Sequence, residues 1–182
     1  EAQDRHRQLS GRARETEGYF YASTVLRESP LIANARQNYQ PLPSPDGKEL
    51  AYIEDRNTLR IYNHATKQSR TLLTDKQLWS NNPNHHVEWS PDGQYLGFDY
   101  SVPGLAPGEV GLIRADGTGG VRNLTESGFN DGTARWILGG QGLMWRSNRD
   151  GLKSVAQTGG TQSDVYAMFL TQEAWDRFRL TK

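Results

Sequence analysis

Few side chains in this sequence stand at spacings that would support catalysis. The four histidines are His6, His64, His85 and His86, and only the last two are neighbours, in the stretch Asn84-His85-His86-Val87-Glu88. That stretch lacks the histidine spacing of a zinc-binding helix and leads into a predicted strand, so we interpret it as a polar loop, with metal binding as the minor alternative. No Gly-x-Ser-x-Gly sequence is present, and no serine has a nearby histidine to act as its base. We therefore expect no catalytic residues, no metal and no cofactor in this chain.

Composition excludes several further classes of site and partner. Cysteine is absent, which excludes disulfides, thiolate zinc sites, iron–sulfur clusters and a cysteine nucleophile. Lys+Arg and Asp+Glu both number 21, whereas proteins that bind nucleic acids or anionic membranes normally carry a basic excess. No apolar run approaches the ~20 residues of a membrane helix, so we expect no membrane insertion. The glycine-rich stretches Gly117–Gly120 and Gly159–Gly160 open no helix, which favours hairpin turns over phosphate loops.

A repeat organises the chain. Ser44-Pro45-Asp46-Gly47 recurs 46 residues later as Ser90-Pro91-Asp92-Gly93, and Ile137-Leu138-Gly139-Gly140 takes the same place 47 residues further on. Proline fixes φ in a tight turn, aspartate tolerates the next position, and glycine supplies the positive φ that closes it. We assign this structural role, rather than a catalytic one, to Asp46, Gly47, Asp92 and Gly93.

The residues after each turn also match. Three positions after the final glycine stand Leu50, Leu96 and Leu143, and five positions after it stand Tyr52, Phe98 and Trp145. Short apolar strands follow each turn, and further strands follow those, which gives four strands in about 46 residues. Repeats of that kind are typical of β-propeller blades. The predicted fold is therefore all-β, with β-propeller blades of four antiparallel strands and a short C-terminal helical linker.

The repeat divides the chain into five segments. A closed ring takes 4 to 8 blades, so we expect these segments to form part of a larger propeller whose uncovered blade faces promote self-association or contact with further propeller chain. The predicted segments are a partial preceding blade with an unplaced N-terminal stretch at 1–37, two blades at 38–85 and 86–133, a blade without a clear fourth strand at 134–170, and a linker helix capped by Thr171 at 171–182.

Residues 38–133 resemble the TolB-type propeller repeat, in which a Trp-Ser-Pro-Asp-Gly turn is followed by an aliphatic–aromatic strand and then by Arg-x-Leu-Thr, here Arg122-Asn123-Leu124-Thr125. Longer stretches are similar to the propeller of Tricorn-like serine peptidases of Gram-negative bacteria, above all Ser147-Asn148-Arg149-Asp150-Gly151 and Asp164–Phe169 with its continuation to Leu180. This resemblance implies a periplasmic location and a downstream PDZ-like module and peptidase domain of the C-terminal-processing type.

The resemblance also implies the function of the chain. It would be a non-catalytic segment of a hydrolase, used for substrate access, peptide binding or scaffolding of the peptidase. One alternative is a stand-alone TolB-like module that binds a protein partner. Another is an extracellular enzyme whose propeller itself holds the active site, although that would require acidic pairs on one rim that the sequence does not place.

Loop length predicts which face binds the peptide or protein. Connections on one face are short, whereas those on the other are long and span 75–86, 99–108, 126–133 and 147–164. Long loops on a rigid scaffold often carry recognition, but they could also serve only to dock the peptidase domain. Arg56 and Arg149 stand nine residues after their turn glycines and could instead tie adjacent blades through carboxylates. The predicted binding rim consists of His85, His86, Arg149 and Asp150.

Overall fold

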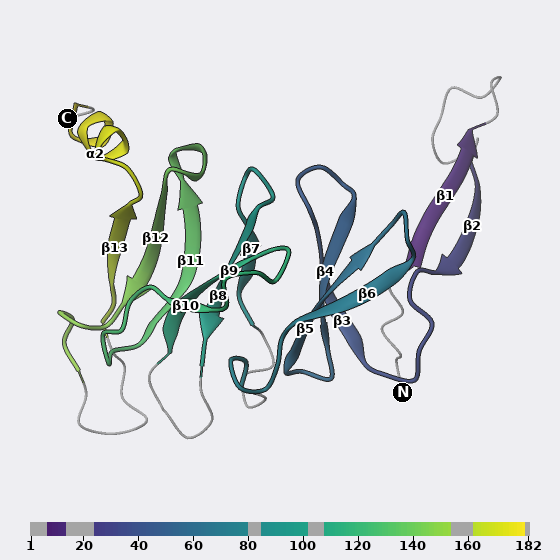
Figure 1. The fold of residues 1–182 in the computed structure, drawn as a ribbon, viewed down its shortest axis with the longest axis horizontal. Coiled ribbons are helices and arrows are strands. Elements are labelled where there is room, and N and C mark those ends of the chain that lie inside the picture. Colours follow the sequence, from purple (N-terminus) through teal and green to yellow (C-terminus); the bar gives the residue numbers. More distant parts are fainter. Residues whose placement is uncertain (1–6, 14–23, 80–84, 102–107, 154–161, 181–182) are drawn as a thin grey trace.

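The chain folds into antiparallel sheets that follow one another along its length. The computed structural model describes residues 7–13, 24–79, 85–101, 108–153 and 162–180. Three sheets lie side by side, with a two-stranded sheet beyond one end of the row and a helix beyond the other (Figure 1). We call the three sheets blades 1, 2 and 3.

Within each blade the strands pair with their neighbours in chain order. Blade 1 contains β3 (Asn38–Pro43), β4 (Glu49–Glu54), β5 (Thr58–Asn63) and β6 (Gln68–Leu73). Blade 2 contains β7 (Val87–Trp89), β8 (Tyr95–Tyr100), β9 (Glu109–Arg114) and β10 (Arg122–Asn123). Blade 3 contains β11 (Asp131–Ile137), the short 3₁₀ turn η1 (Leu138–Gly140), β12 (Gly142–Ser147) and β13 (Asp164–Phe169). Two blades thus have four strands, and three strands of the third are described.

The repeated turns adopt one geometry in blades 1 and 2. The Ser44 hydroxyl donates to Asp46 Oδ1 at 2.8 Å and accepts from the Glu49 backbone N–H at 3.0 Å. Ser90 makes the same two contacts, with Asp92 and Tyr95. The final glycines have φ of +69° at Gly47 and +70° at Gly93, which is the left-handed region that favours glycine. The sequence therefore encodes the β3–β4 and β7–β8 turns locally.

The second strand of each blade buries the residues that the repeat aligned. Leu50, Leu96 and Leu143 and the aromatic set Tyr52, Phe98 and Trp145 are all at most 7% exposed. Leu96 and Phe98 pack against Ala51 and Ile53 of blade 1, whereas Leu143 and Trp145 pack against Val110 of blade 2. The core therefore lies between blades, and the predicted equivalence of these six buried positions is confirmed.

Two contacts recur at each junction between blades. The indole Nε1 of Trp89 donates to the Leu42 carbonyl at 3.0 Å, and that of Trp136 donates to the Glu88 carbonyl at 3.5 Å. On the turn face, a Cβ built on Gly93 would lie 3.6 Å from Pro45 Cδ, and one built on Gly140 would lie 3.2 Å from Pro91 Cδ. Each turn proline therefore abuts the turn glycine of the next blade.

The two ends of the row differ in how well the sequence predicted them. At one end β1 (Arg7–Ala13) pairs with β2 (Thr24–Pro30). A partial blade was predicted within 1–37, of which 1–6 and 14–23 lie outside the described residues, and the separate strand β1 was not predicted. At the other end α2 (Gln172–Leu180) begins after Thr171, whose hydroxyl accepts the Ala174 N–H at 3.1 Å. The predicted N-cap is confirmed.

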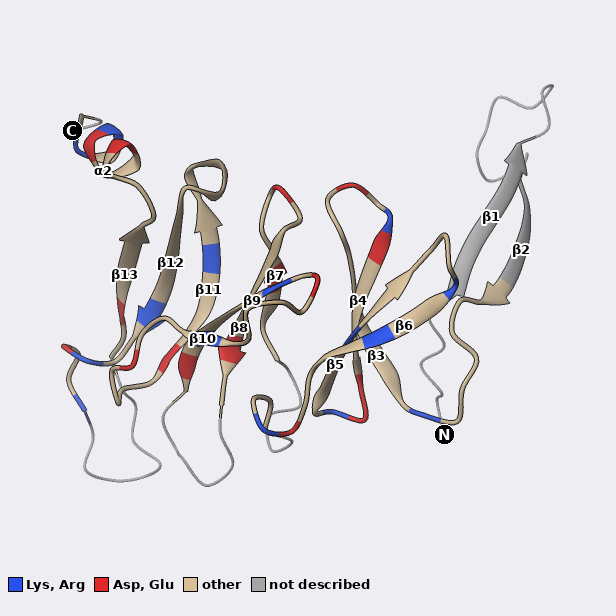
Figure 2. Cartoon of the chain, viewed as in Figure 1, with Lys and Arg blue, Asp and Glu red and all other residues tan. Residues whose placement is uncertain are grey.

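Charge is distributed over the blades rather than gathered on one of them. Lys and Arg alternate with Asp and Glu across the sheets in Figure 2. Within the described parts of the chain, no helix is both long and apolar enough to cross a membrane.

Candidate functional site

The four predicted rim residues lie at one end of the blades but belong to two of them. His85 and His86 come directly before β7, whereas Arg149 and Asp150 follow β12. The start of β11 pairs with the end of β12, with Asp131 opposite Ser147, so the two pairs of residues share the face of the long connections. Among the described residues, no hydrogen bond or ion pair joins the histidines to Arg149 or Asp150. The predicted rim therefore consists of two separate groups of residues on one face, the histidines before β7 and the Arg149–Asp150 pair after β12.

His85 is buried and fixed in one tautomer. The residue is only 4% exposed, and the Nε2 atom of its ring lies 2.6 Å from the carbonyl oxygen of Arg56 in blade 1. Because a carbonyl only accepts, Nε2 must carry the proton, and burial lowers the pKa of His85, which favours the neutral ring. The ring's Nδ1 is therefore a buried hydrogen-bond acceptor, and it has no partner within the described structure.

His86 and its neighbours join blade 2 to blade 3. The Nε2 of His86 lies 2.6 Å from the Ala134 carbonyl, and the side chain of Asp99 accepts the Thr133 N–H at 2.7 Å. Burial raises the pKa of Asp99, while hydrogen bonding to Thr133 and the nearby His86 and His85 act in the opposite direction. Asp99 could not be singled out from the sequence, because its partner Thr133 is 34 residues away.

A small hollow opens between the first strands of blades 1 and 2. Its volume is about 240 Å³, below the ≈ 300–1,000 Å³ of pockets that hold drug-sized ligands. It therefore suits a single side chain rather than a cofactor. Its polar lining consists of Gln40, His85, His86 and Arg135, and its apolar lining of Pro41, Leu42, Ala51, Ile53, Leu59 and Val87.

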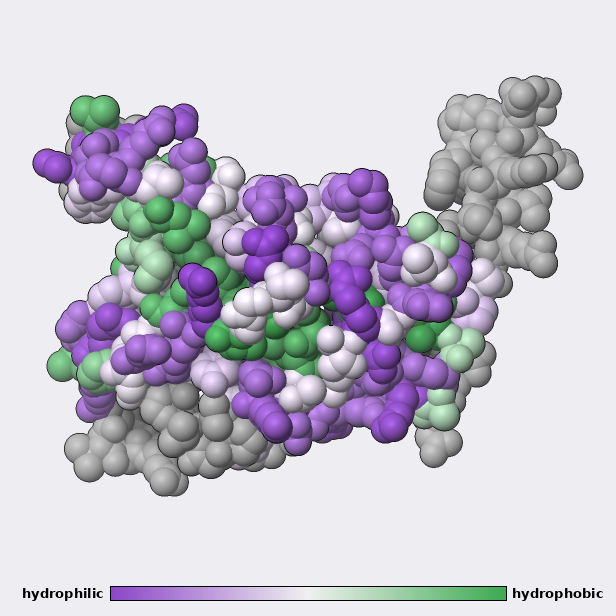
Figure 3. Space-filling view, in the orientation of Figure 1, coloured by the Kyte–Doolittle hydropathy of each residue, from purple (hydrophilic) through white to green (hydrophobic). Residues whose placement is uncertain are grey.

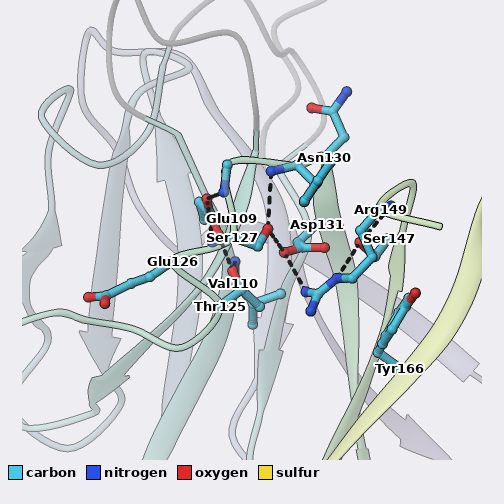
Figure 4. A network of polar contacts seen from close by, with 12 residues as sticks. Glu109, Val110, Thr125, Glu126, Ser127, Asn130, Asp131, Ser147, Arg149 and Tyr166 are labelled. Atoms are coloured by element: carbon cyan, nitrogen blue, oxygen red, sulfur yellow. Dashed lines mark hydrogen bonds and ion pairs between the residues drawn. The ribbon is translucent and has the colours of Figure 1, made fainter. Parts of the chain in front are cut away.

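The second place on this face is an ion pair buried in blade 3 (Figure 4). Asp131, whose side chain is fully buried, accepts from Arg149 Nη2 at 3.1 Å and from the Ser127 hydroxyl. Arg149 Nε donates to the Ser147 hydroxyl at 3.1 Å. Arg149 therefore binds a carboxylate of its own sheet, rather than of an adjacent blade as one reading of the sequence suggested.

The connection from β10 to β11 is held by another carboxylate. Glu109 accepts the N–H groups of Ser127 and Gly128, the latter at 3.0 Å, together with the hydroxyl of Thr125. The Val110 N–H in turn donates to the Thr125 hydroxyl at 3.1 Å. These bonds and those of Ser127 to Asp131 form the network in Figure 4. They fix the loop that carries the chain from blade 2 to blade 3.

Asp150 and Tyr166 form the exposed part of this rim. The Tyr166 hydroxyl donates to Asp150, and this hydrogen bond is the main reason that the pKa of Tyr166 rises to about 12. The Arg149 guanidinium lies over the Tyr166 ring at 4.4 Å from its centroid, within cation–π distance. Tyr166 was not predicted as a site residue, since it lies 16 residues from Asp150 in the sequence.

The described arrangement offers binding groups rather than a reacting pair. In the parts of the chain that are described, no serine hydroxyl hydrogen-bonds to a histidine, and no group of three or more His, Asp or Glu side chains is placed to hold a metal ion. What the face does offer is a neutral acceptor at His85, a partly exposed guanidinium at Arg135, and a rigid rim around Arg149.

No protein-family model matches the chain, and no curated protein matches its sequence. Solved structures do match its fold. The tricorn protease is 11% identical over 85% of this chain, with a TM-score of 0.60. A putative TolB from Agrobacterium tumefaciens is 17% identical over 89%, with a TM-score of 0.51. The chain spans 15% of the former and 57% of the latter. At these identities the likeness shows the fold, which is that of β-propeller blades.

Proposed function

We propose that this chain is a non-catalytic propeller segment of a Tricorn-like periplasmic serine peptidase and binds an extended peptide on the face of the long connections. The observation that carries the proposal is the hollow between β3 and β7. It combines an apolar floor with the enclosed ring of His85, whose Nδ1 has no partner among the described residues. A peptide matches this hollow, because one of its aliphatic side chains would fill the apolar floor.

Size and charge favour a peptide over other ligands. At about 240 Å³, the hollow is smaller than the pockets that hold drug-sized ligands, which suits side chains of a peptide better than a whole small molecule. Arg135 adds a positive charge, since its side chain is 59% exposed and only loosely paired with Glu88 at 3.6 Å. A carboxylate of the peptide would form a further ion pair with the exposed guanidinium of Arg135. Lys+Arg and Asp+Glu balance at 21 each, so the chain offers no general attraction for polyanions.

The rim around Arg149 would flank the bound peptide without moving. Its guanidinium is held by Asp131, Ser147 and the Tyr166 ring, so little conformational entropy remains to be lost on binding. Asp150 is the exposed charge of this rim. Together with His85 and His86 it would select the peptide before it reaches a peptidase domain elsewhere in the protein.

The structural likeness to the tricorn protease and the sequence stretches from Ser147 to Leu180 support the assignment to a peptidase. The second candidate is a stand-alone TolB-like interaction module that binds a protein partner. It is favoured by the putative TolB structure, of which this chain covers the larger share, 57%.

The test uses the full-length protein and fluorescein-labelled peptides from digested casein. Val87→Phe should fill the hollow and weaken binding, measured by fluorescence anisotropy, about tenfold or more. Gln94→Ala, on the face of the short turns, is the matched control and should leave the affinity unchanged. Loss of binding from Gln94→Ala with Val87→Phe silent would show that the wrong face was chosen. Cleavage of the same peptides by the full-length protein would favour the peptidase over the TolB-like module.

A further inference from the structure

We infer that the open edge of β13 is a binding site for one added strand, and that this strand carries a Leu-Thr pair. The inference concerns an interaction surface that is separate from the peptide hollow and independent of the proposed function. It rests on a comparison of equivalent positions in the three blades. In blades 1 and 2 a fourth strand lies on this edge, whereas β13 is the last described strand of blade 3.

The register identifies the equivalent positions. Six residues after each turn glycine stand Ile53, Asp99 and Arg146. Their partners on the third strand are Leu59, Val110 and Val165. Leu59 is 1% exposed and Val110 is 0% exposed, but Val165 is 64% exposed. The same position is therefore buried in the two blades that another blade covers and open in the third.

The fourth strands of blades 1 and 2 show what fits against that position. Leu73 of β6 lies opposite Leu59, and the backbone N–H of Leu124 donates to the Val110 carbonyl at 2.8 Å. Each of these leucines is followed by a threonine, Thr74 or Thr125. The position opposite Val165 is therefore expected to take the leucine of a Leu-Thr pair.

The backbone of β13 is oriented to accept such a strand. The Leu170 N–H donates to the Gln141 carbonyl at 2.9 Å, which makes this pair a hydrogen-bonded one in the antiparallel ladder. Because hydrogen-bonded and non-bonded pairs alternate, the N–H and C=O groups of Val165, Ala167 and Phe169 are directed away from β12. No described residue pairs with these groups, and an edge of this kind is a template for strand addition.

The residues directly after β13 do not fill this edge. The chain enters α2 after Thr171 caps the helix, and Ala174 is fully buried at its base. The ring centroids of Trp175 and Phe178 lie 5.2 and 5.0 Å from that of Phe169. These rings are 40% and 44% exposed, and Figure 3 shows hydrophobic surface on this side of the molecule. The described residues that follow β13 therefore do not supply the added strand.

The experiment supplies the strand as a peptide. A synthetic copy of residues 119–127, which contains β10, is titrated against the intact chain while backbone amide hydrogen exchange is followed. Saturable slowing of exchange at Val165, Ala167 and Phe169 is expected. A peptide in which the residue corresponding to Leu124 is aspartate should bind about tenfold more weakly. Protection at other strands only, or equal protection by a scrambled peptide, would overturn the inference.

A variant of the chain keeps the test independent of peptide chemistry. Val165→Pro removes an N–H that β12 does not use, and proline is tolerated on such strand edges. This variant should retain the melting temperature of the parent but bind the peptide about tenfold more weakly. Unchanged peptide affinity in a folded Val165→Pro variant would place the peptide elsewhere. Protection of β13 that rises with protein concentration alone would assign the edge to a second copy and also overturn the inference.

Discussion

The close contact between Phe98 and Gly111 provides a sharp test of how blades 1 and 2 are packed. The two residues lie opposite each other on β8 and β9. A Cβ added to Gly111 would lie 2.5 Å from Phe98 Cζ and 2.8 Å from two further ring carbons, against an optimum of about 3.5–4.0 Å. The ring is 0% exposed and packs in the core shared with blade 1. It therefore has no room to retreat.

Gly111→Ala should consequently lower the free energy of unfolding by about 2 kcal/mol, as expected for overpacking of a core. For a chain of this size that corresponds to roughly 4 to 8 °C in Tm, measured by circular dichroism. Gly97→Ala is the matched control, because its Cβ would lie 3.7 Å from Leu143, an ordinary contact. It should leave the protein unchanged or stabilise it by up to about 1 kcal/mol through the unfolded state.

A double-mutant cycle identifies the cause. Phe98→Leu removes the ring, so it should cost less stability in the Gly111→Ala background than in the parent, with a coupling energy of roughly 0.5–3 kcal/mol. Equal losses from the two glycine variants, or a coupling energy of zero, would refute the reasoning that the ring lies over the glycine.

Four further outcomes are expected. Arg149→Gln should destabilise the chain by about 3 kcal/mol in urea titrations, because the fully buried Asp131 loses its countercharge; a smaller loss in an Asp131→Asn background would confirm the cause. The N–H and side chain of Lys48 hold the pKa of Asp46 at about 2. The stability that this carboxylate contributes should therefore be complete above its unfolded pKa near 3.9 and be lost as the pH falls toward 2. Asp46→Asn should abolish that part of the pH dependence of the free energy of unfolding. The purified chain should self-associate, and a compact monomer in light scattering would contradict this. It should also leave peptides uncleaved, and hydrolysis that survives removal of trace proteases would contradict that.

The sequence was sufficient for features that are written into a few adjacent residues. The turn at Ser44–Gly47 needs only its own side chains and the left-handed glycine, so it could be recognised from a short motif. The buried positions Leu96 and Phe98 followed from counting forward from the next turn. Strand alternation then fixed which face they occupy.

Features that depend on contacts between blades could not be predicted in the same way. The hydrogen bond from His86 to Ala134 spans 48 residues, and nothing near His86 in the sequence indicates it. His85 was predicted on a binding rim, but one nitrogen of its ring already hydrogen-bonds to the Arg56 carbonyl of the neighbouring blade. Its role in binding remains a prediction. β1 lacked the turn and aromatic pattern on which strand assignment relied.

The packing of each turn proline against the turn glycine of the next blade has an evolutionary consequence. Pro45 abuts Gly93, and Pro91 abuts Gly140, so each unit brings a projection for its successor and a recess for its predecessor. A duplicated unit inserted into the series would find both halves of its junction already present on its neighbours. Gene duplication could then lengthen or shorten the series without inventing a new interface, since each repeat contacts mainly the repeats beside it. The recess at Gly140 also restricts drift, because a Cβ there would lie only 3.2 Å from Pro91 Cδ and would press the two adjacent units apart.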